Sequence, residues 1–289
     1  MLSMNNVSRH NPEAILATWR ALAAATPHLH QPQAAAAMRL PEACLAASRC
    51  GKAATRLAGE RDAILASMTA LGKILIAVPH HAGVAIAIAA ELSHDIKDGW
   101  LTLTAEKVQL RLALSAIDSL YAVIDPQGPH GRERHLQLFD AEGNGICKLL
   151  VLYKRYEREL VALAERYRSP YQSRVWQPST PAYRPPAVSY PGDTPAAQGA
   201  IECLTRWHKA ALPVRFRAQR PNVGLDVVCA PTRVNHDSSS GVLHAHHPTF
   251  KLHTRLAAWR SPLVWDSGIC SQADNSWFGC KPVAKEQQR

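Results

Sequence analysis

The sequence feature that most constrains the fold is a β-hairpin pattern at residues 132–153, RERHLQLFDAEGNGICKLLVLY. In the first arm, Leu136 and Leu138 face one way and their polar neighbours the other, whereas the second arm, residues 146–152, is an almost unbroken apolar run. The DAEGNG segment between the arms has residue types that tolerate positive φ and bond their own backbone. An arm that is apolar on both faces belongs inside a sheet, so neighbouring segments are expected to pair with it.

The segments around this hairpin predict an α+β fold. Apolar residues recur with helical spacing early in the chain, and the period then changes to that of strands. The predicted helices span residues 12–25, 32–38, 40–50 and 61–71, and the predicted strands span 74–78, 84–90, 100–103, 108–114 and 120–124. Residues 125–131 are predicted to form a loop, and a helix over residues 153–167 closes the domain. Helices that precede an antiparallel sheet, with one more helix after it, are typical of the α+β class.

Proline and charge divide the chain into three parts. A first repeat is predicted over residues 11–168, a Pro-rich linker over 169–196, and a shortened, divergent second repeat over 197–289. The linker carries seven prolines, which favour an extended, semi-rigid spacer. After it, residues 197–211 are predicted as a helix and residues 225–229, 241–244 and 250–253 as short strands, with no assignment from Asp266 onward. The formal charge of +10 is concentrated after residue 168, where it amounts to +7.

The composition favours a cytoplasmic protein that does not cross a membrane. Seven cysteines in a chain of 289 residues show no dense spacing pattern, which indicates reduced thiols. No secretory signal is recognisable at the amino terminus, because the first ten residues are polar and no apolar segment comes directly after them. The most apolar stretch, residues 71–92, is interrupted by Lys73 and Pro79 and falls short of the roughly 20 residues of a span.

Residues 33–51 show the spacing of a helix-turn-helix, and they raise a second hypothesis, a basic nucleic-acid-binding regulator. The would-be recognition helix offers Arg49 as its single cation, whereas binding to phosphates needs several. Packing of these helices onto the rest of the domain is therefore the favoured interpretation, and nucleic acid is a disfavoured partner.

With this order of elements in place, the chain resembles the HemS/ChuS/HmuS family of haem-utilisation proteins. The similarity is strongest in residues 107–153, KVQLRLALSAIDSLYAVIDPQGPHGRERHLQLFDAEGNGICKLLVLY, and continues in the AAxxxLPExxL run near residues 34–45 and in Leu71-Gly72 before a strand. It covers most of residues 14–168. The resemblance implies a cytoplasmic haem-binding protein made of two similar halves, which carries or degrades imported haem.

The second half resembles the family less closely. IECLTRWH, residues 201–208, is similar to a family helix whose histidine binds the haem iron, and HPTFKLH, residues 247–253, is similar to a strand motif. Arg206 replaces the acid that the family has before the ligand, and the region after Trp265 lacks the closing hairpin motif. A third hypothesis is therefore a purely structural relative, in which the first half folds and the tail is decayed.

The resemblance makes His208 the leading iron ligand, with Arg215, Arg217 and Arg220 as partners for the haem propionates. The alternative for His208 is an exposed helical histidine beside Lys209. His80 and His81, in a predicted turn between two strands, are secondary candidates. Haem is the implied cofactor, an external reductant is needed for any haem degradation, and a haem importer or a haem-accepting enzyme is the implied partner. A haem site also needs cations and an apolar slot.

A separate histidine cluster occurs in residues 244–247, HAHH. On a strand, His244 and His246 share a face and could bind a metal together with Cys229 or His236. The spacing lacks the helical or paired-cysteine pattern of zinc sites, so a metal site is the minor interpretation. No nucleophile motif, phosphate loop or pair of carboxylates stands out, which disfavours hydrolases and nucleotide-binding enzymes.

Overall fold

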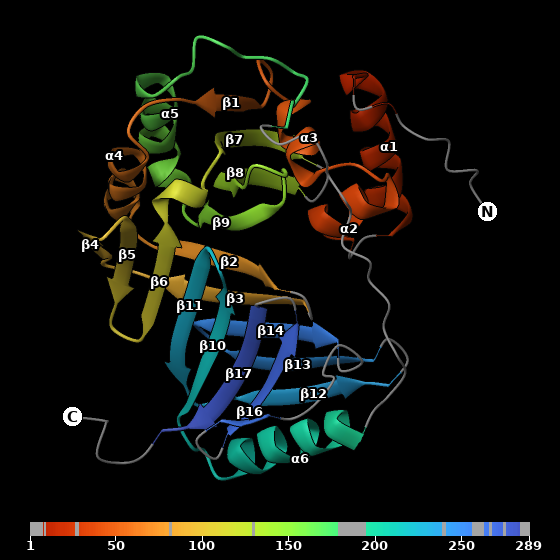
Figure 1. Ribbon diagram of the computed structural model, residues 1–289, viewed down its shortest axis with the longest axis vertical. Helices are drawn as coiled ribbons and strands as arrows, with labels where there is room; N and C mark the ends of the chain where they lie inside the picture. Colours follow the sequence, from red (N-terminus) through yellow and green to blue (C-terminus); the bar gives the residue numbers. More distant parts are fainter. Residues whose placement is uncertain are drawn as a thin grey trace. The chain divides into compact units, whose positions relative to one another are not determined.

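The fold was analysed in a computed structural model (Figure 1). The structure describes residues 8, 10–26, 29–80, 83–128, 131–178, 195–238, 241–255, 263–265, 268–273 and 276–283. The chain divides into two compact units. Unit 1 comprises Met1–Ile74 and Leu114–Ala187, and unit 2 comprises Leu75–Ala113 and Val188–Arg289.

Unit 1 begins with three short helices that agree with the predicted pattern. Asn11 caps the first helix, because its side-chain Oδ1 accepts a hydrogen bond from the Ala14 backbone N–H at 3.0 Å. The predicted helix over 61–71 becomes an α-helix followed by a 3₁₀ turn. The helical elements are α1 (Pro12–Ala25), α2 (Gln31–Ala37), α3 (Glu42–Ala47), α4 (Arg61–Ala66), η1 (Ser67–Leu71), η2 (Leu114–Ala116), η3 (Lys154–Tyr156) and α5 (Glu157–Arg166).

The predicted hairpin is confirmed and supplies the last two strands of the unit 1 sheet. The sheet is antiparallel, in the order β1 (Ala54–Leu57), β7 (Ser119–Gly128), β8 (Gly131–Phe139) and β9 (Gly145–Val151). The side chain of Asp140 fixes the turn between β8 and β9, because its Oδ1 accepts hydrogen bonds from the backbone N–H groups of Glu142 and Asn144 at 3.0 and 2.8 Å.

The prediction of a loop over residues 125–131 is wrong. Strands β7 and β8 continue to Gly128 and Gly131, which pair with each other after a shift of register that begins at Asp125. A bulge lets the ladder continue past Pro126, which has no N–H to donate.

The core of unit 1 includes a side chain from the segment predicted as a linker. Trp176 is buried in the cluster that also holds Trp19, Leu45 and Phe139. A Cβ atom on Gly143 would lie 2.8 Å from Trp176, so only glycine fits this turn, which also has a φ of +80°. The first ten residues of the predicted linker, 169–178, therefore belong to unit 1, whereas residues 179–194 lie outside the described residues.

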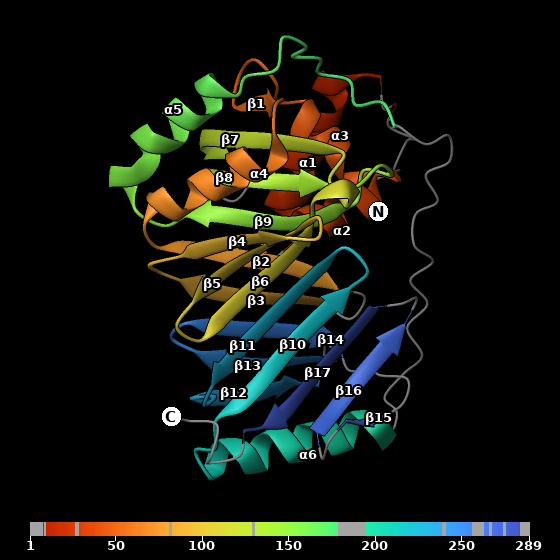
Figure 2. The same cartoon turned by 60° about the vertical axis from the view of Figure 1, so that its left-hand side comes forward.

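The described part of unit 2 contains strands of two antiparallel sheets together with the helix α6 (Pro195–Lys209) (Figures 1 and 2). The first sheet has the order β2 (Ile74–His80), β3 (Gly83–Ala89), β14 (Phe250–Arg255), β13 (Val242–His247) and β12 (Arg233–Asp237). The second has the order β15 (Leu263–Trp265), β16 (Gly268–Ala273), β17 (Ser276–Pro282), β10 (Val214–Arg220), β11 (Val223–Cys229), β6 (Val108–Ala113), β5 (Trp100–Ala105) and β4 (Ser93–Lys97).

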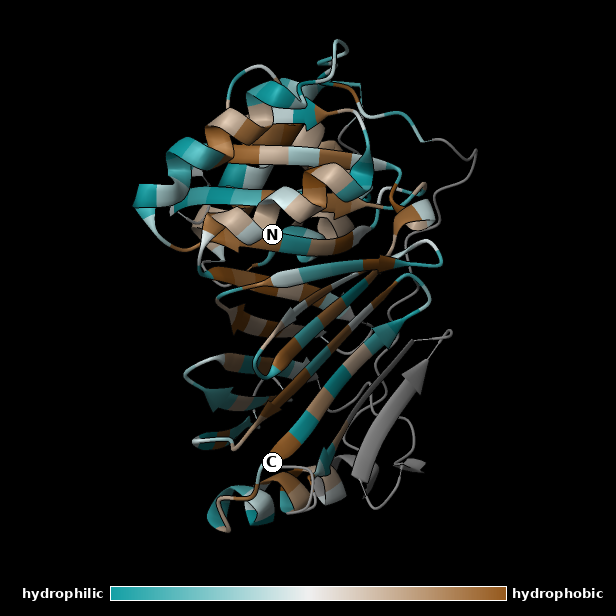
Figure 3. Cartoon of the chain, turned by 90° about the vertical axis from the view of Figure 1, so that its left-hand side faces the viewer, coloured by the Kyte–Doolittle hydropathy of each residue, from teal (hydrophilic) through white to brown (hydrophobic). Residues whose placement is uncertain are grey.

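Alternating side chains build the core of unit 2. Along β10, Val214, Phe216 and Ala218 are buried while the residues between them are partly exposed. Figure 3 shows the same alternation of hydrophobic and hydrophilic residues along several strands of the second sheet. The rings of Phe216 and Phe250, one from each sheet, lie 4.5 Å apart between centroids, so the buried faces of the two sheets pack against each other.

Segments far apart in the sequence pair within unit 2. Strand β6 from the first half of the chain pairs with β11 from the second, with Leu110 opposite Leu225. Residues 75–113, inside the predicted first repeat, thus share a unit with residues 188–289. The units are defined by contacts in the structure, whereas the repeats are predicted from the sequence. The predicted repeat boundaries at residues 168 and 197 stay a prediction.

The end of the chain contains a hairpin that the sequence pattern did not indicate. Strands β16 and β17 pair over five residues, from Ile269 opposite Cys280 to Ala273 opposite Ser276. The expectation that a closing hairpin is missing after Trp265 is therefore wrong. Within the described part of the chain, no helix is long and apolar enough to cross a membrane.

Candidate functional site

The leading candidate ligand, His208, lies in the last turn of α6. The helix packs through Ala200, Leu204 and Trp207, which are spaced by four and three residues and are all buried. Ala211, with a φ of +50°, ends the helix, and its N–H donates to the His208 carbonyl at 3.0 Å. His208 is thus held on a rigid element whose end is fixed.

The geometry of the His208 ring indicates which nitrogen can bind a metal. Its Nδ1 lies 2.8 Å from the backbone carbonyl oxygen of Pro231, on the segment between β11 and β12. A carbonyl oxygen can only accept, so the hydrogen bond assigns the proton to Nδ1. In the neutral ring, Nε2 then carries the lone pair, and the ring is half-buried. A histidine whose other nitrogen donates to a carbonyl is the usual arrangement of a metal ligand.

Two of the three predicted arginines share one face of β10. Arg215 and Arg217 lie on the outer face, and both contact Asp226 of β11. The Arg217 Nε donates to Asp226 Oδ2 at 2.6 Å, and the Arg215 Nε lies 3.5 Å from Oδ1. Both guanidinium groups therefore contact the carboxylate of Asp226. The two guanidinium side chains are 31 and 34% exposed, so an added anion can reach them.

Arg220 is not brought to the same face. It is the last residue of β10, opposite Val223. Because side chains alternate along a strand, Arg220 faces the side of the sheet opposite to Arg215 and Arg217. Of the secondary candidates, His80 ends strand β2, and its side chain lies outside what the structure describes. His81 lies outside the described residues.

An open hollow of about 700 Å³ lies along α6, with a mostly apolar lining. It is lined by Ile201, Glu202, Thr205, Arg206, Lys209 and Ala210. His208 lies seven positions after Ile201, which places both on one side of the helix, although His208 does not line the hollow. The size falls within the usual range of small-molecule sites, about 300–1,000 Å³.

The helix-turn-helix hypothesis is not supported by the structure. All six residues of α3 are buried, so this helix offers no surface to DNA. Arg49, the single cation of the predicted recognition helix, is 3% exposed, and its Nη1 lies 2.5 Å from Glu133 and 3.6 Å from Asp125. A buried, paired guanidinium cannot contact phosphate.

The sequence interpretation missed the two partners that define the candidate residues. No sequence pattern indicated that His208 contacts the Pro231 carbonyl or that Arg217 contacts the Asp226 carboxylate. The first contact depends on loop packing and the second on strand pairing. The alternation of Val214, Phe216 and Ala218 with polar residues could have shown that Arg215 and Arg217 belong to a strand.

Comparison with known proteins agrees with this fold. Residues 39–167 match the family described as "Haemin-degrading HemS.ChuX domain". This stretch is a HemS/ChuX domain. The family resemblance found in the sequence is thereby confirmed, and no curated protein matches the chain. The HemS/ChuX match runs from α3 to α5, so His208, Arg215 and Arg217 lie beyond it.

Solved structures extend the likeness over almost the whole chain. Apo-PhuS, a haem-binding protein from Pseudomonas aeruginosa, is 17% identical with a TM-score of 0.74, and the alignment covers 95% of this chain and 94% of PhuS. The haem-degrading enzyme ChuS from Escherichia coli O157:H7 is 16% identical with a TM-score of 0.74, and 96% of each chain is covered. At these identities the likeness shows the fold, which confirms the predicted α+β class.

Proposed function

We propose that the protein binds haem and carries or degrades it. The observation that carries this proposal is the HemS/ChuX domain at residues 39–167. The fold of PhuS and ChuS, described as a haem-binding protein and a haem-degrading enzyme, supports it over nearly the full length. The proposed location is cytoplasmic, because the seven cysteines of the sequence show no dense spacing pattern of the kind found in disulfide-rich secreted proteins.

His208 is the proposed iron ligand. Its Nδ1–H donates to Pro231, so Nε2 is the nitrogen that would bind iron. The hollow beside α6 offers mostly apolar surface for a macrocycle, as a haem site requires. Arg215 and Arg217 would pair with the propionates, in competition with Asp226. Arg220, His80 and His81 remain secondary candidates.

Haem, when bound, supplies redox-active iron, and the protein supplies the ligand and controls access. Carriage and degradation differ in the fate of the bound haem. A carrier passes intact haem from an importer to a haem-accepting enzyme, whereas a degrading enzyme consumes it with electrons from an external reductant. Loss of the Soret band on adding ascorbate to the haem complex, with free hemin as control, would distinguish degradation from carriage.

The test of haem binding is a hemin titration of the full chain, monitored by visible absorbance. A saturable Soret band at one hemin per chain is expected. His208→Ala is expected to weaken binding at least tenfold, which is about 1.4 kcal/mol. His94→Ala is the matched control, because His94 is an exposed histidine on β4 of the same unit. Absence of a saturable band in the unmodified chain would contradict the proposed function.

A further inference from the structure

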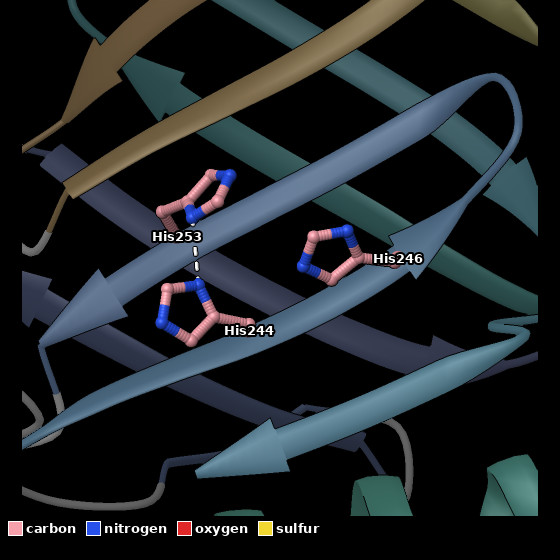
Figure 4. Close-up of side chains that lie close together, drawn as sticks. All are labelled: His244, His246 and His253. Carbon is pink, nitrogen blue, oxygen red and sulfur yellow. Dashed lines mark hydrogen bonds between the residues drawn. The ribbon is translucent and has the colours of Figure 1, made fainter. Parts of the chain in front are cut away.

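Three histidines gather on one side of the β13–β14 hairpin (Figure 4). His244 and His246 lie two residues apart on β13, and His253 on β14 pairs directly with His244. Leu243, Ala245 and Leu252 point to the other, buried side of the sheet. The alternation of the strands therefore fixes all three imidazoles on the outer face, where they are partly exposed.

The ligating atoms of the three rings are close together. One nitrogen from each ring lies within 4.8 Å of the other two. The Nδ1 atoms of His244 and His253 are 2.7 Å apart, and the His246 and His253 ring centroids are separated by 5.5 Å. The cluster joins His244 and His253, nine positions apart in sequence, because the strand register aligns them.

The contact between His244 and His253 also restricts protonation. A hydrogen bond between two Nδ1 atoms needs one donor and one acceptor, so at least one of these rings is neutral. Burial lowers the pKa of His246, and the neighbouring His244, Lys251 and Arg233 lower it further. Neutral imidazole is the form of histidine that binds metals.

We infer that His244, His246 and His253 bind a divalent first-row transition metal ion of the Zn²⁺ class, with a fourth position open to solvent. Three imidazoles suit Zn²⁺, Cu²⁺ or Ni²⁺, whereas Mg²⁺ and Ca²⁺ prefer oxygen ligands. This site is distinct from the proposed haem ligand on α6, and the inference does not depend on haem binding.

Small side-chain movements are enough to complete the site. Tetrahedral Zn²⁺ with bonds of about 2.0–2.1 Å needs ligand nitrogens about 3.3–3.4 Å apart, so the 2.7 Å pair must open by about 0.6 Å. His246 must approach the other two. Lys251 and Arg233 pair with His246 on its two sides, and these cations oppose binding of a dication.

The site differs from the one that the sequence suggested. His236 lies opposite Leu243, so its side chain is on the other face of the sheet. Cys229 is on β11 of the second sheet, and burial raises the pKa of its thiol to about 12. Neither residue can join His244 and His246, and His253 takes the third position instead.

The test is a calorimetric titration of the chelator-treated full chain with Zn²⁺. The chain has 14 histidines and 7 cysteines, so the informative readout is the difference in the number of bound ions between variants. The double variant His244→Gln/His253→Gln is expected to lose one site. The matched control His236→Gln, an exposed histidine on the adjacent strand, and His208→Ala are expected to keep it.

An unchanged number and affinity of Zn²⁺ sites in a folded double variant would overturn the inference. If circular dichroism shows that the double variant is unfolded, the single variant His246→Gln decides. This variant keeps the His244–His253 pair, so a loss of Zn²⁺ affinity of tenfold or more supports the site, and an unchanged affinity overturns it. Binding of Mg²⁺ should be the same in all of these variants as in the unmodified chain.

Discussion

The two units differ in how they use arginine side chains. In unit 1, Arg49 is almost fully buried and is neutralised by Glu133 and Asp125, with its guanidinium also 4.8 Å from the centre of the Trp19 ring. In unit 2, Arg215 and Arg217 are about one-third exposed, and both contact the carboxylate of Asp226. The same residue type can therefore serve either purpose. Burial and pairing decide whether an arginine stabilises the fold or is accessible to an anionic ligand.

Removal of Arg49 should give the largest effect and sharpen this comparison. Arg49→Ala leaves the buried Asp125 and the mostly buried Glu133 without their cation, and we expect a loss of about 3–5 kcal/mol in the free energy of unfolding. Arg217→Ala, the same change at a pair whose arginine is about one-third exposed, should cost at most about 1 kcal/mol. Urea denaturation monitored by circular dichroism measures both. Equal losses in the two variants would break the distinction between the units.

The buried histidine of unit 1 should make stability depend on pH. Burial lowers the pKa of His135 well below its ordinary value, and the nearby charges of Lys148 and Arg49 act in the same direction. The unfolded chain therefore takes up a proton below about pH 6.5 that the folded chain does not, so stability falls as the pH falls.

This pH dependence can be isolated by substitution. Below about pH 6.5, the His135 contribution to the free energy of unfolding should decrease by about 1.4 kcal/mol per pH unit, down to the folded pKa. Denaturation of the unmodified chain and of His135→Leu at several pH values between about 5 and 7.5 would measure the difference between their slopes. Identical slopes would show that His135 is accessible to protons in the folded state.

The smallest expected effect concerns Asp226. If Arg215 and Arg217 hold the propionates, Asp226→Asn removes their competitor and should tighten hemin binding about threefold, roughly 0.7 kcal/mol. A hemin titration at low ionic strength would measure the change, with Asp237→Asn on β12 as a charge-matched control. Weaker binding in Asp226→Asn alone would indicate that the carboxylate positions the arginines rather than competing for them.

The sequence predicted local structure well and strand pairing poorly. The β8–β9 hairpin could be predicted because its turn residues and its alternation are both local, and α6 because its apolar spacing is helical. Strand β10 is not among the predicted strands, because its apolar residues are few in number and alternate with the polar residues of VRFRAQR. Trp176 lies in a Pro-rich segment and gave no sign of the core that it enters.

The candidate sites show the same limit. His208 could be singled out from a helix and a family resemblance, but its hydrogen bond to Pro231 depends on how α6 packs near the start of β12. His244 and His246 could be placed on one face from their spacing alone. Their partner His253 could not, because a register shift of one residue would have turned it to the buried side.

The measurement that tests the account most directly is chemical rescue of the iron ligand. His208→Gly removes the imidazole and leaves space for a free one, so hemin bound to this variant should lose the Soret maximum of the unmodified complex. Added imidazole should restore it saturably, in the full chain and with His94→Gly as control. If His208→Gly binds hemin with an unchanged spectrum and imidazole alters nothing, His208 is not the ligand and the haem site lies elsewhere.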